Sequence, residues 1–510
     1  MIFHLEASTS RLRSDMPTIE ESLRKKQSIF LNVSSKEQLE TIYRFAQKFT
    51  TVGILQFYFF WILCCLHGII TVMKDKNSSV AGEYFSYFVP CVLMAIATQS
   101  ASIIDKVFIG NFVNPVEMGA VNACVPITQF VYTLSVLIGV GASAVISVLK
   151  GQKKEEDCNR VLGAAVLWSI FFGLLFLIFL IVCSDFVLAF LLKDKSIQEL
   201  AKAYYLIFIF MVPFRLVSSV VQNISRADGF PKIGSVAVIV SNICNVFFNW
   251  LFMGPMEMGV RGASYGTLIC FFVECVINLS YFLCKGRTFK LWFKGALAKT
   301  GSIFSMGLSA CIGTGLIAFK LVILNNLAEK LNGETGLVVM AVCLSCLSLA
   351  SMFSAGANNA MLPLAGKYFG SKDMENFKCV IKFSAITLFL FTTVVVILLE
   401  FFAGAFTHLH GVQNEVEVYL CVQSIQIYAV SLYGMCFTFF MIYLLPVIGK
   451  KLISTMMSIC EGFAFIVPLC FVFSSFMGLK GIWVAFIVTE ILTVGVYFAG
   501  NKISKKIDKK

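Results

Sequence analysis

Charged residues are scarce in this sequence. Asp, Glu, Lys and Arg make up only 14% of the 510 residues, whereas hydrophobic residues make up 58%. An average soluble domain is about one quarter charged, so this pool is too small for a surface that faces water on all sides. The mean hydropathy of +0.84 points the same way. Much of the exterior is therefore expected to face lipid.

Motifs of common soluble chemistries are also missing. The sequence has no GxxxxGK[ST] run, which argues against ATP hydrolysis. Its four histidines form no HExxH zinc motif: His4, His67, His408 and His410. Its 18 cysteines are scattered along the chain and form neither a disulfide framework nor a zinc cluster. We therefore expect no enzyme activity, no metal site and no permanently bound cofactor.

Long apolar runs dominate what remains. A run of about 20 apolar residues can cross a bilayer as a helix, whereas barrel strands are short and alternating. After residue 73 the sequence predicts twelve helical spans, at about 84–110, 116–149, 161–183, 201–222, 233–254, 262–284, 301–328, 336–365, 376–402, 418–443, 453–475 and 481–500. The fold class is thus an all-α polytopic membrane protein.

The loops between these spans alternate in charge. Every second loop is rich in Lys and Arg, as is the tail at 501–510, while the intervening loops carry mostly Asp and Glu. The positive-inside rule places the basic loops and the C-terminus in the cytoplasm. It also accounts for the net charge of +12 without nucleic acid as a partner. We predict a multi-pass protein of the cell membrane whose partner is the lipid bilayer.

Residues 1–72 are interpreted as an N-terminal appendage. Its first 50 residues are polar, and a hydrophobic segment follows at about 52–73. That segment is long enough to be an extra span, and it lacks the small-residue cleavage site of a signal peptide. Met73 then resembles a fresh cytoplasmic N-terminus. The alternative is an upstream start assigned wrongly to the gene.

An internal repeat divides the spans into two halves. Gly141-Ala-Ser-Ala resembles Gly356-Ala-Asn-Asn, 215 residues later, and Gly259-Val-Arg-Gly resembles Gly478-Leu-Lys-Gly, 219 residues later. The prediction is two pseudo-symmetric six-helix lobes, at 73–284 and 300–500, with a cytoplasmic linker at 285–299. In transporters, binding sites commonly lie between such repeats.

Two residues of the first span, and one in the second half, stand out for a functional role. A charge within a membrane usually faces a cavity or a partner. Asp105 is such a charge, and Pro90 can bend the same helix. The repeat offset places Lys320 opposite Asp105, which suggests a gating pair between the lobes. The alternatives are an interfacial Asp105 and a Lys320 in a static pair or reaching to the interface.

Further polar residues lie within later spans. Glu461 is a second protonatable group, or else faces the cytoplasmic mouth. Glu274 and Glu490 are better explained as hydrogen-bonding groups between helices. Asn242, Asn245 and Asn249 are spaced by three and four residues, so they share one helical face. That face is expected to point inward, to bind a ligand or to join helices.

Together these segments resemble the MATE (multidrug and toxic compound extrusion) family, over about residues 84–500. In the first half, the resemblance is carried by Pro90…Asp105-Lys-Val-Phe-Ile-Gly110, Ala120-Val-Asn122…Pro126, Gly139-Val-Gly-Ala-Ser143…Gly151, Arg226-Ala-Asp-Gly229-Phe-Pro-Lys, Asn242…Asn249 and Gly259-Val-Arg-Gly-Ala. In the second half, it is carried by Gly356-Ala…Gly366, Gly449-Lys, Gly478-Leu-Lys-Gly-Ile-Trp483 and Glu490.

The resemblance implies a V-shaped fold of two lobes and a monomer that exports amphipathic, often cationic, organic compounds in exchange for H⁺ or Na⁺. It implies that Asp105 and Asn245 belong to a cation site in the N-terminal lobe. Many members have Asp where this chain has Asn249, which weakens a complete sodium site. The alternative function is a flippase for lipid-linked oligosaccharides, which commonly uses more cavity-lining Arg.

The appendage generates a testable prediction. A chain that begins at Met73 should insert into membranes and transport as well as the full-length chain does, because the twelve predicted spans all follow that residue. Membrane yield and vesicle transport of the two chains provide the comparison. Loss of insertion or transport in the shorter chain would show that residues 1–72 are required for that step.

Overall fold

The computed structural model describes residues 78–112, 124–191 and 195–507. The predicted appendage at 1–72 and its hydrophobic segment at 52–73 lie outside the described residues. Within the described part the chain is helical and contains no strand. The all-α fold class predicted from the sequence is therefore confirmed.

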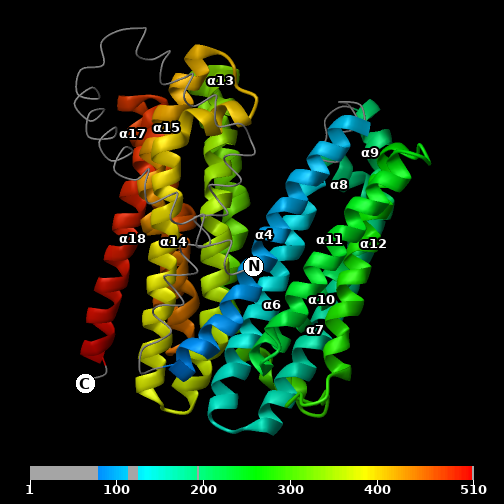
Figure 1. Cartoon of the computed structure of the whole chain (residues 1–510), viewed down its shortest axis with the longest axis vertical. Coiled ribbons are helices and arrows are strands. Elements are labelled where there is room, and N and C mark those ends of the chain that lie inside the picture. Colours follow the sequence, from blue (N-terminus) through cyan, green and yellow to red (C-terminus); the bar gives the residue numbers. More distant parts are fainter. Residues whose placement is uncertain (1–77, 113–123, 192–194, 508–510) are drawn as a thin grey trace, which may run out of the picture. The chain divides into compact units, whose positions relative to one another are not determined.

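The described residues of the first half form eight α-helices and end in a short 3-10 helix (Figure 1). These are α4 (Ser78–Phe112), α6 (Val125–Gly151), α7 (Glu155–Val182), α8 (Ser184–Leu191), α9 (Lys195–Phe208), α10 (Met211–Asp228), α11 (Pro231–Met253), α12 (Gly259–Leu279) and η1 (Ser280–Leu283). One predicted span, 201–222, falls on both α9 and α10. Pro213 lies in the first turn of α10, where its missing N–H is tolerated.

The second half starts with a 3-10 helix and contains one π-helical turn. Its elements are η2 (Ala296–Lys299), α13 (Thr300–Gly370), α14 (Met374–Leu409), α15 (Glu415–Val447), α16 (Lys451–Ile459), η3 (Cys460–Ala464), α17 (Ile466–Met477) and α18 (Leu479–Ile507). The π-helical turn η3 interrupts the span predicted at 453–475. The sequence reading did not foresee this interruption.

The long helix α13 is a hairpin of two arms, 300–331 and 334–370. Its backbone leaves helical geometry at Asn332 and Gly333, and Gly333 has a φ of 59°, which favours glycine. A Cβ on Gly336 would lie only 2.1 Å from the carbonyl oxygen of Ala328. Eight residues of straight helix would separate these positions by about 12 Å, so the chain must fold back.

Counting both arms, the described helices provide the twelve expected spans. Eleven stretches are long and apolar enough to cross a membrane, and α13 lies within one of them, Ala296–Gly370. Because that stretch contains both arms of the hairpin, it supplies two crossings. The twelve-helix prediction is confirmed within the described part, although several helices extend beyond the predicted bounds.

Each half of the chain has its own hydrophobic core. One buried cluster runs from Cys124 to Ala263, and a larger one runs from Leu324 to Phe486. A third cluster joins the halves, packing Val136 and Val140 of α6 against residues of α13, α15 and α16. The two cores define an N-terminal and a C-terminal lobe, as the repeat predicted.

The lobes meet through five glycines, which we call the glycine seam: Gly141, Gly151, Gly307, Gly366 and Gly370. They lie where α6 packs against both arms of α13. A Cβ on Gly307 would lie 2.0 Å from the carbonyl oxygen of Leu137, and one on Gly370 would lie 2.0 Å from that of Val148. These distances leave no room for a side chain, so the helices touch backbone to backbone.

Helix α4 belongs to the N-terminal half of the sequence but contacts both lobes (Figure 1). Near its start, Tyr84 shares a hydrogen bond of 2.8 Å with Thr387 of α14. After Pro90 it also packs on α11, where Ser235 donates a hydrogen bond to the Pro90 carbonyl oxygen. The same segment also contacts the C-terminal lobe, since Val92 packs against Gly356 of α13 and Gln99 donates a hydrogen bond to Ser351 of α13.

The glycine seam generates a stability prediction. Gly307→Ala should lower the free energy of unfolding by about 1–3 kcal/mol, the usual cost of overpacking, because its Cβ would collide with the backbone of Leu137. Gly495→Ala is the matched control, since a Cβ there would have no neighbour within 4 Å and alanine favours helices. Thermal unfolding in detergent measures both. Equal melting temperatures for Gly307→Ala and Gly495→Ala would mean that the glycine seam accommodates the added methyl group without loss of stability.

Candidate functional site

The N-terminal lobe contains a buried pair of amides on α11. The Nδ2 of Asn249 donates to the Oδ1 of Asn245 across 3.1 Å, and both side chains are buried. Gly266 of α12 faces them closely, since a Cβ there would lie 2.1 Å from the Oδ1 of Asn249. The predicted inward face of α11 is therefore confirmed for these two residues.

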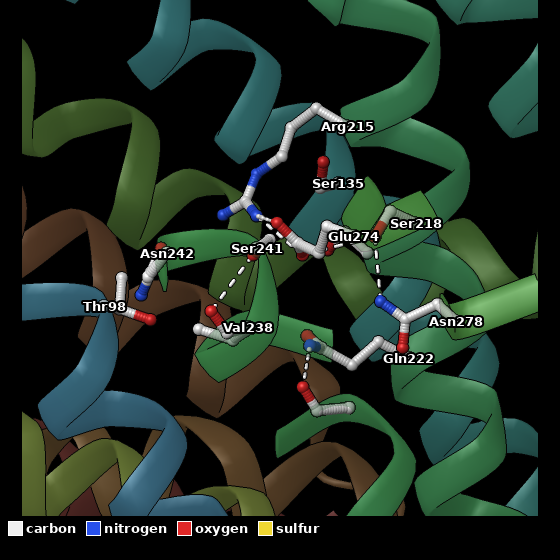
Figure 2. Close-up of polar contacts among 12 residues, drawn as sticks. Thr98, Ser135, Arg215, Ser218, Gln222, Val238, Ser241, Asn242, Glu274 and Asn278 are labelled. Atoms are coloured by element: carbon white, nitrogen blue, oxygen red, sulfur yellow. Dashed lines mark hydrogen bonds and ion pairs between the residues drawn. The ribbon is translucent and has the colours of Figure 1, made fainter. Parts of the chain in front are cut away.

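The third amide of that face joins helices. The Nδ2 of Asn242 donates to the carbonyl oxygen of Ala97 in α4 across 2.9 Å, and Figure 2 shows Asn242 beside Thr98. Asp105 lies two turns further along α4, and its side chain is outside the described residues. Its cation-coupling role, with Asn245 and Asn249, stays a prediction.

An ion pair between a partly buried arginine and a buried glutamate lies in the same lobe (Figure 2). The Nη1 of Arg215 in α10 lies 3.0 Å from both carboxylate oxygens of Glu274 in α12. Ser218 also donates to Glu274, and Asn278 donates to Ser218. The interhelical role expected for Glu274 is confirmed. Sequence reasoning missed Arg215, whose signal was a lone arginine inside an apolar span.

The C-terminal lobe contains a second buried ion pair. The ammonium of Lys320 lies 2.7 Å from a carboxylate oxygen of Glu461, and the two side chains are 6% and 1% exposed. Glu461 belongs to the π-helical turn η3. Lys320 thus pairs within its own lobe in this structure. Its predicted role opposite Asp105 stays a prediction.

Glu490 lies near this pair on α18. It is buried, and it accepts a hydrogen bond of 2.7 Å from the hydroxyl of Thr438 in α15. The interhelical role expected for Glu490 is therefore confirmed. The sequence did not reveal that Glu490 lies near this pair: it follows Phe486 by one turn of α18, and the ring of Phe486 lies 5.7 Å from the Lys320 ammonium.

Several polar contacts between the lobes lie at one end of the helices, which we call the basic end because Lys150, Arg226 and Lys367 lie there. A further contact, from the Nε2 of Gln129 in α6 to the carbonyl oxygen of Thr314 in α13, lies away from that end. Glu83 of α4 accepts hydrogen bonds from Lys367 and Tyr368 of α13. Arg226 of α10 donates to the amide oxygen of Asn359 in α13 across 2.9 Å. Arg226 is buried, and the partners in its hydrogen bonds are neutral.

Metal chemistry has no obvious centre in the described part of the chain, where no group of three or more His, Cys, Asp or Glu side chains is placed to hold a metal ion. Two ion pairs, Arg215–Glu274 and Lys320–Glu461, each lie within one lobe. Paired charges among membrane-spanning helices in two lobes define a polytopic membrane protein with a polar interior.

Comparison with known proteins identifies the family. The family model MatE matches residues 90–251 and 306–472, which together exceed half of the chain. The chain therefore belongs to the MATE family, as the sequence resemblance predicted. The two matched blocks correspond to the two lobes.

Curated relatives match along most of their length. The chain is 23% identical over 435 residues to the multidrug export protein MepA of Staphylococcus aureus strain MSSA476, covering 82% of this chain and 94% of that protein. It is 22% identical over 432 residues, with the same coverage, to MepA of Staphylococcus haemolyticus.

Solved structures share the fold. An outward-facing multidrug resistance MATE transporter superposes with a TM-score of 0.78 at 18% identity, covering 84% of this chain and 96% of that one. A transporter of the MOP superfamily from Pyrococcus furiosus superposes with a TM-score of 0.77 at 18% identity, with the same coverage. That transporter is described as having a binding pocket of reverse polarity, which suggests a different function for it.

The ion pair in Figure 2 generates a prediction. Glu274→Ala should destabilise the protein by about 3 kcal/mol or more, since it leaves a partly buried charge on Arg215 without its partner. The double variant Arg215→Met with Glu274→Leu should recover most of that loss, because apolar replacements need no partner. Thermal unfolding in detergent gives both values. A double variant as unstable as the single one would contradict this account.

Proposed function

We propose that this protein is a secondary antiporter that exports amphipathic, often cationic, organic compounds in exchange for H⁺ or Na⁺. The observation that carries the proposal is the division into two lobes, each with its own core and its own buried ion pair. Such lobes can move as bodies while their internal charges stay neutralised. The multidrug export named for the curated relatives supports the substrate class.

Alternating access follows from where the lobes touch. The glycine seam and the contacts Glu83–Lys367 and Arg226–Asn359 hold the lobes together at the basic end. By the charge of its loops that end is cytoplasmic, so this arrangement is closed toward the cytoplasm. Opening toward the cytoplasm must break these contacts, while the cores of the lobes remain intact.

Coupling requires that the cation and the substrate favour different states, because a ligand shifts an equilibrium only through differential affinity. We assign the cation to the N-terminal lobe, at Asp105 with Asn245 and Asn249. An amide at position 249 supplies no charge to a metal ion, so protonation of Asp105 suits this lobe at least as well as sodium binding. We assign to Pro90 a bend in α4 through which cation binding at Asp105 changes the arrangement of the lobes.

Export of organic cations is favoured over flipping of a lipid-linked oligosaccharide. A pyrophosphate-linked lipid needs several unpaired bases inside the protein. Among the described residues the buried bases are Arg226 and Lys320, and Lys320 is neutralised by Glu461. Arg215 is likewise paired with Glu274. The interior thus offers little free positive charge for a diphosphate.

The coupling role of Asp105 can be tested in vesicles. Purified protein should export a fluorescent organic cation when a pH or sodium gradient is applied, and Asp105→Asn should abolish that export. Gradients of each ion applied separately identify the coupling ion. Asp185→Asn is the control, because Asp185 is exposed and paired with Lys202 near the surface. Unchanged gradient-driven export by Asp105→Asn would remove Asp105 from the mechanism.

A further inference from the structure

Three ionisable side chains in the C-terminal lobe have charges that do not cancel. Lys320 comes from the first arm of α13, Glu461 from η3 and Glu490 from α18, and all three are buried. We call them the C-terminal triad. One ammonium and two carboxylates leave a net charge of −1 when all three are ionised. The triad therefore differs from the Arg215–Glu274 pair of the other lobe, which is neutral.

Close helix contacts hold the segments that carry these groups, and Phe486, one turn before Glu490 on α18, has its ring 5.7 Å from the Lys320 ammonium. Gly434 of α15 lets the stem of Glu490 pass, since a Cβ on Gly434 would lie 2.4 Å from the Cβ of Glu490. Gly462 acts in the same way beside Glu461, because a Cβ there would lie 2.8 Å from the Cβ of Leu316. The π-helical turn around Glu461 is of a kind often found at functional sites. The triad is thus a built site.

The surroundings of the triad do not supply the missing positive charge. Titratable side chains near the triad include Tyr428 and Cys436 of α15 and Cys470 of α17. These phenol and thiol groups are ordinarily neutral at pH 7. Thr438 and the ring of Phe486, which lies 5.7 Å from the Lys320 ammonium, are uncharged as well.

One carboxylate oxygen of the triad also lacks a hydrogen-bond partner. Glu461 receives its ion pair at Oε1, whereas Oε2 is buried and has no hydrogen-bond partner within the described structure. A buried polar atom left in that state is costly. Glu490 forms no ion pair in the described structure, and a second buried carboxylate near an ion pair that is already neutral favours the uptake of a proton.

We propose that the C-terminal triad is a second proton-binding site, in which Glu461 and Glu490 share one proton while Lys320 stays charged. The proton binds to a carboxylate oxygen, and no bond other than this O–H forms. A metal cation is disfavoured because the ammonium of Lys320 already occupies the position beside Glu461. The site goes beyond the proposed coupling at Asp105 and does not depend on it.

The charge count predicts how many protons each variant holds. At neutral pH the natural triad should hold one proton, and Glu490→Gln should hold none because Lys320 then neutralises Glu461. Lys320→Met should hold two protons, since neither carboxylate retains a cation. The double variant Lys320→Met with Glu461→Gln should return to one. A purely structural role for these residues predicts no such pattern.

Infrared difference spectroscopy of the purified full-length protein tests the count. Protonated carboxyl bands are compared between each variant and the natural protein, and ¹³C-labelled glutamate separates them from any band of Asp105. Thr438→Val should shift the band without removing it, because Thr438 donates to Glu490. Monodisperse elution in detergent verifies that each variant is folded.

Two outcomes would overturn the proposal. One is a glutamate band that persists unchanged in Glu490→Gln, and the other is a Lys320→Met variant with no additional protonated carboxyl. Asp105→Asn should leave the glutamate band in place even where it abolishes export. Failure of the antiport mechanism and failure of the second proton site are therefore told apart by the same set of proteins.

Discussion

Burial of charge among apolar helices is the constraint on which the rest of the structure depends. Lipid offers neither water nor counter-ions, so a charged side chain inside the membrane needs a partner in the protein. Arg215 finds Glu274 on a neighbouring helix, and Lys320 finds Glu461. The two partners of each pair belong to the same lobe. The lobes can thus move against each other without exposing these charges to hydrocarbon.

The same constraint separates the tasks of the two lobes. In the N-terminal lobe the ion pair is neutral and the amides of α11 are hydrogen-bonded. In the C-terminal lobe an additional carboxylate, Glu490, leaves an excess of negative charge. A shared helical frame therefore carries two different electrostatic designs, and the difference lies in a few side chains.

Sequence patterns predicted the helices well and their partners poorly. Apolar runs and loop charges are properties of single segments, so the twelve spans and the two lobes could be read in advance. The partner of Lys320 could not, because Glu461 is 141 positions away and only packing brings them together. The repeat offset pointed instead to Asp105, since a register comparison matches positions and ignores contacts. The π-helical turn at Glu461 has no simple sequence signal either.

The glycine seam has a consequence for the rate at which the lobes can separate. Contacts in which Cα atoms approach carbonyl oxygens are individually weak, about 0.5–1 kcal/mol each. At the glycines themselves no side chain interlocks with the opposite backbone. Separation of the lobes is therefore resisted mainly by contacts outside the seam. These are the polar contacts of Glu83 and Arg226 and the apolar cluster that packs Val136 and Val140 of α6 against α13, α15 and α16.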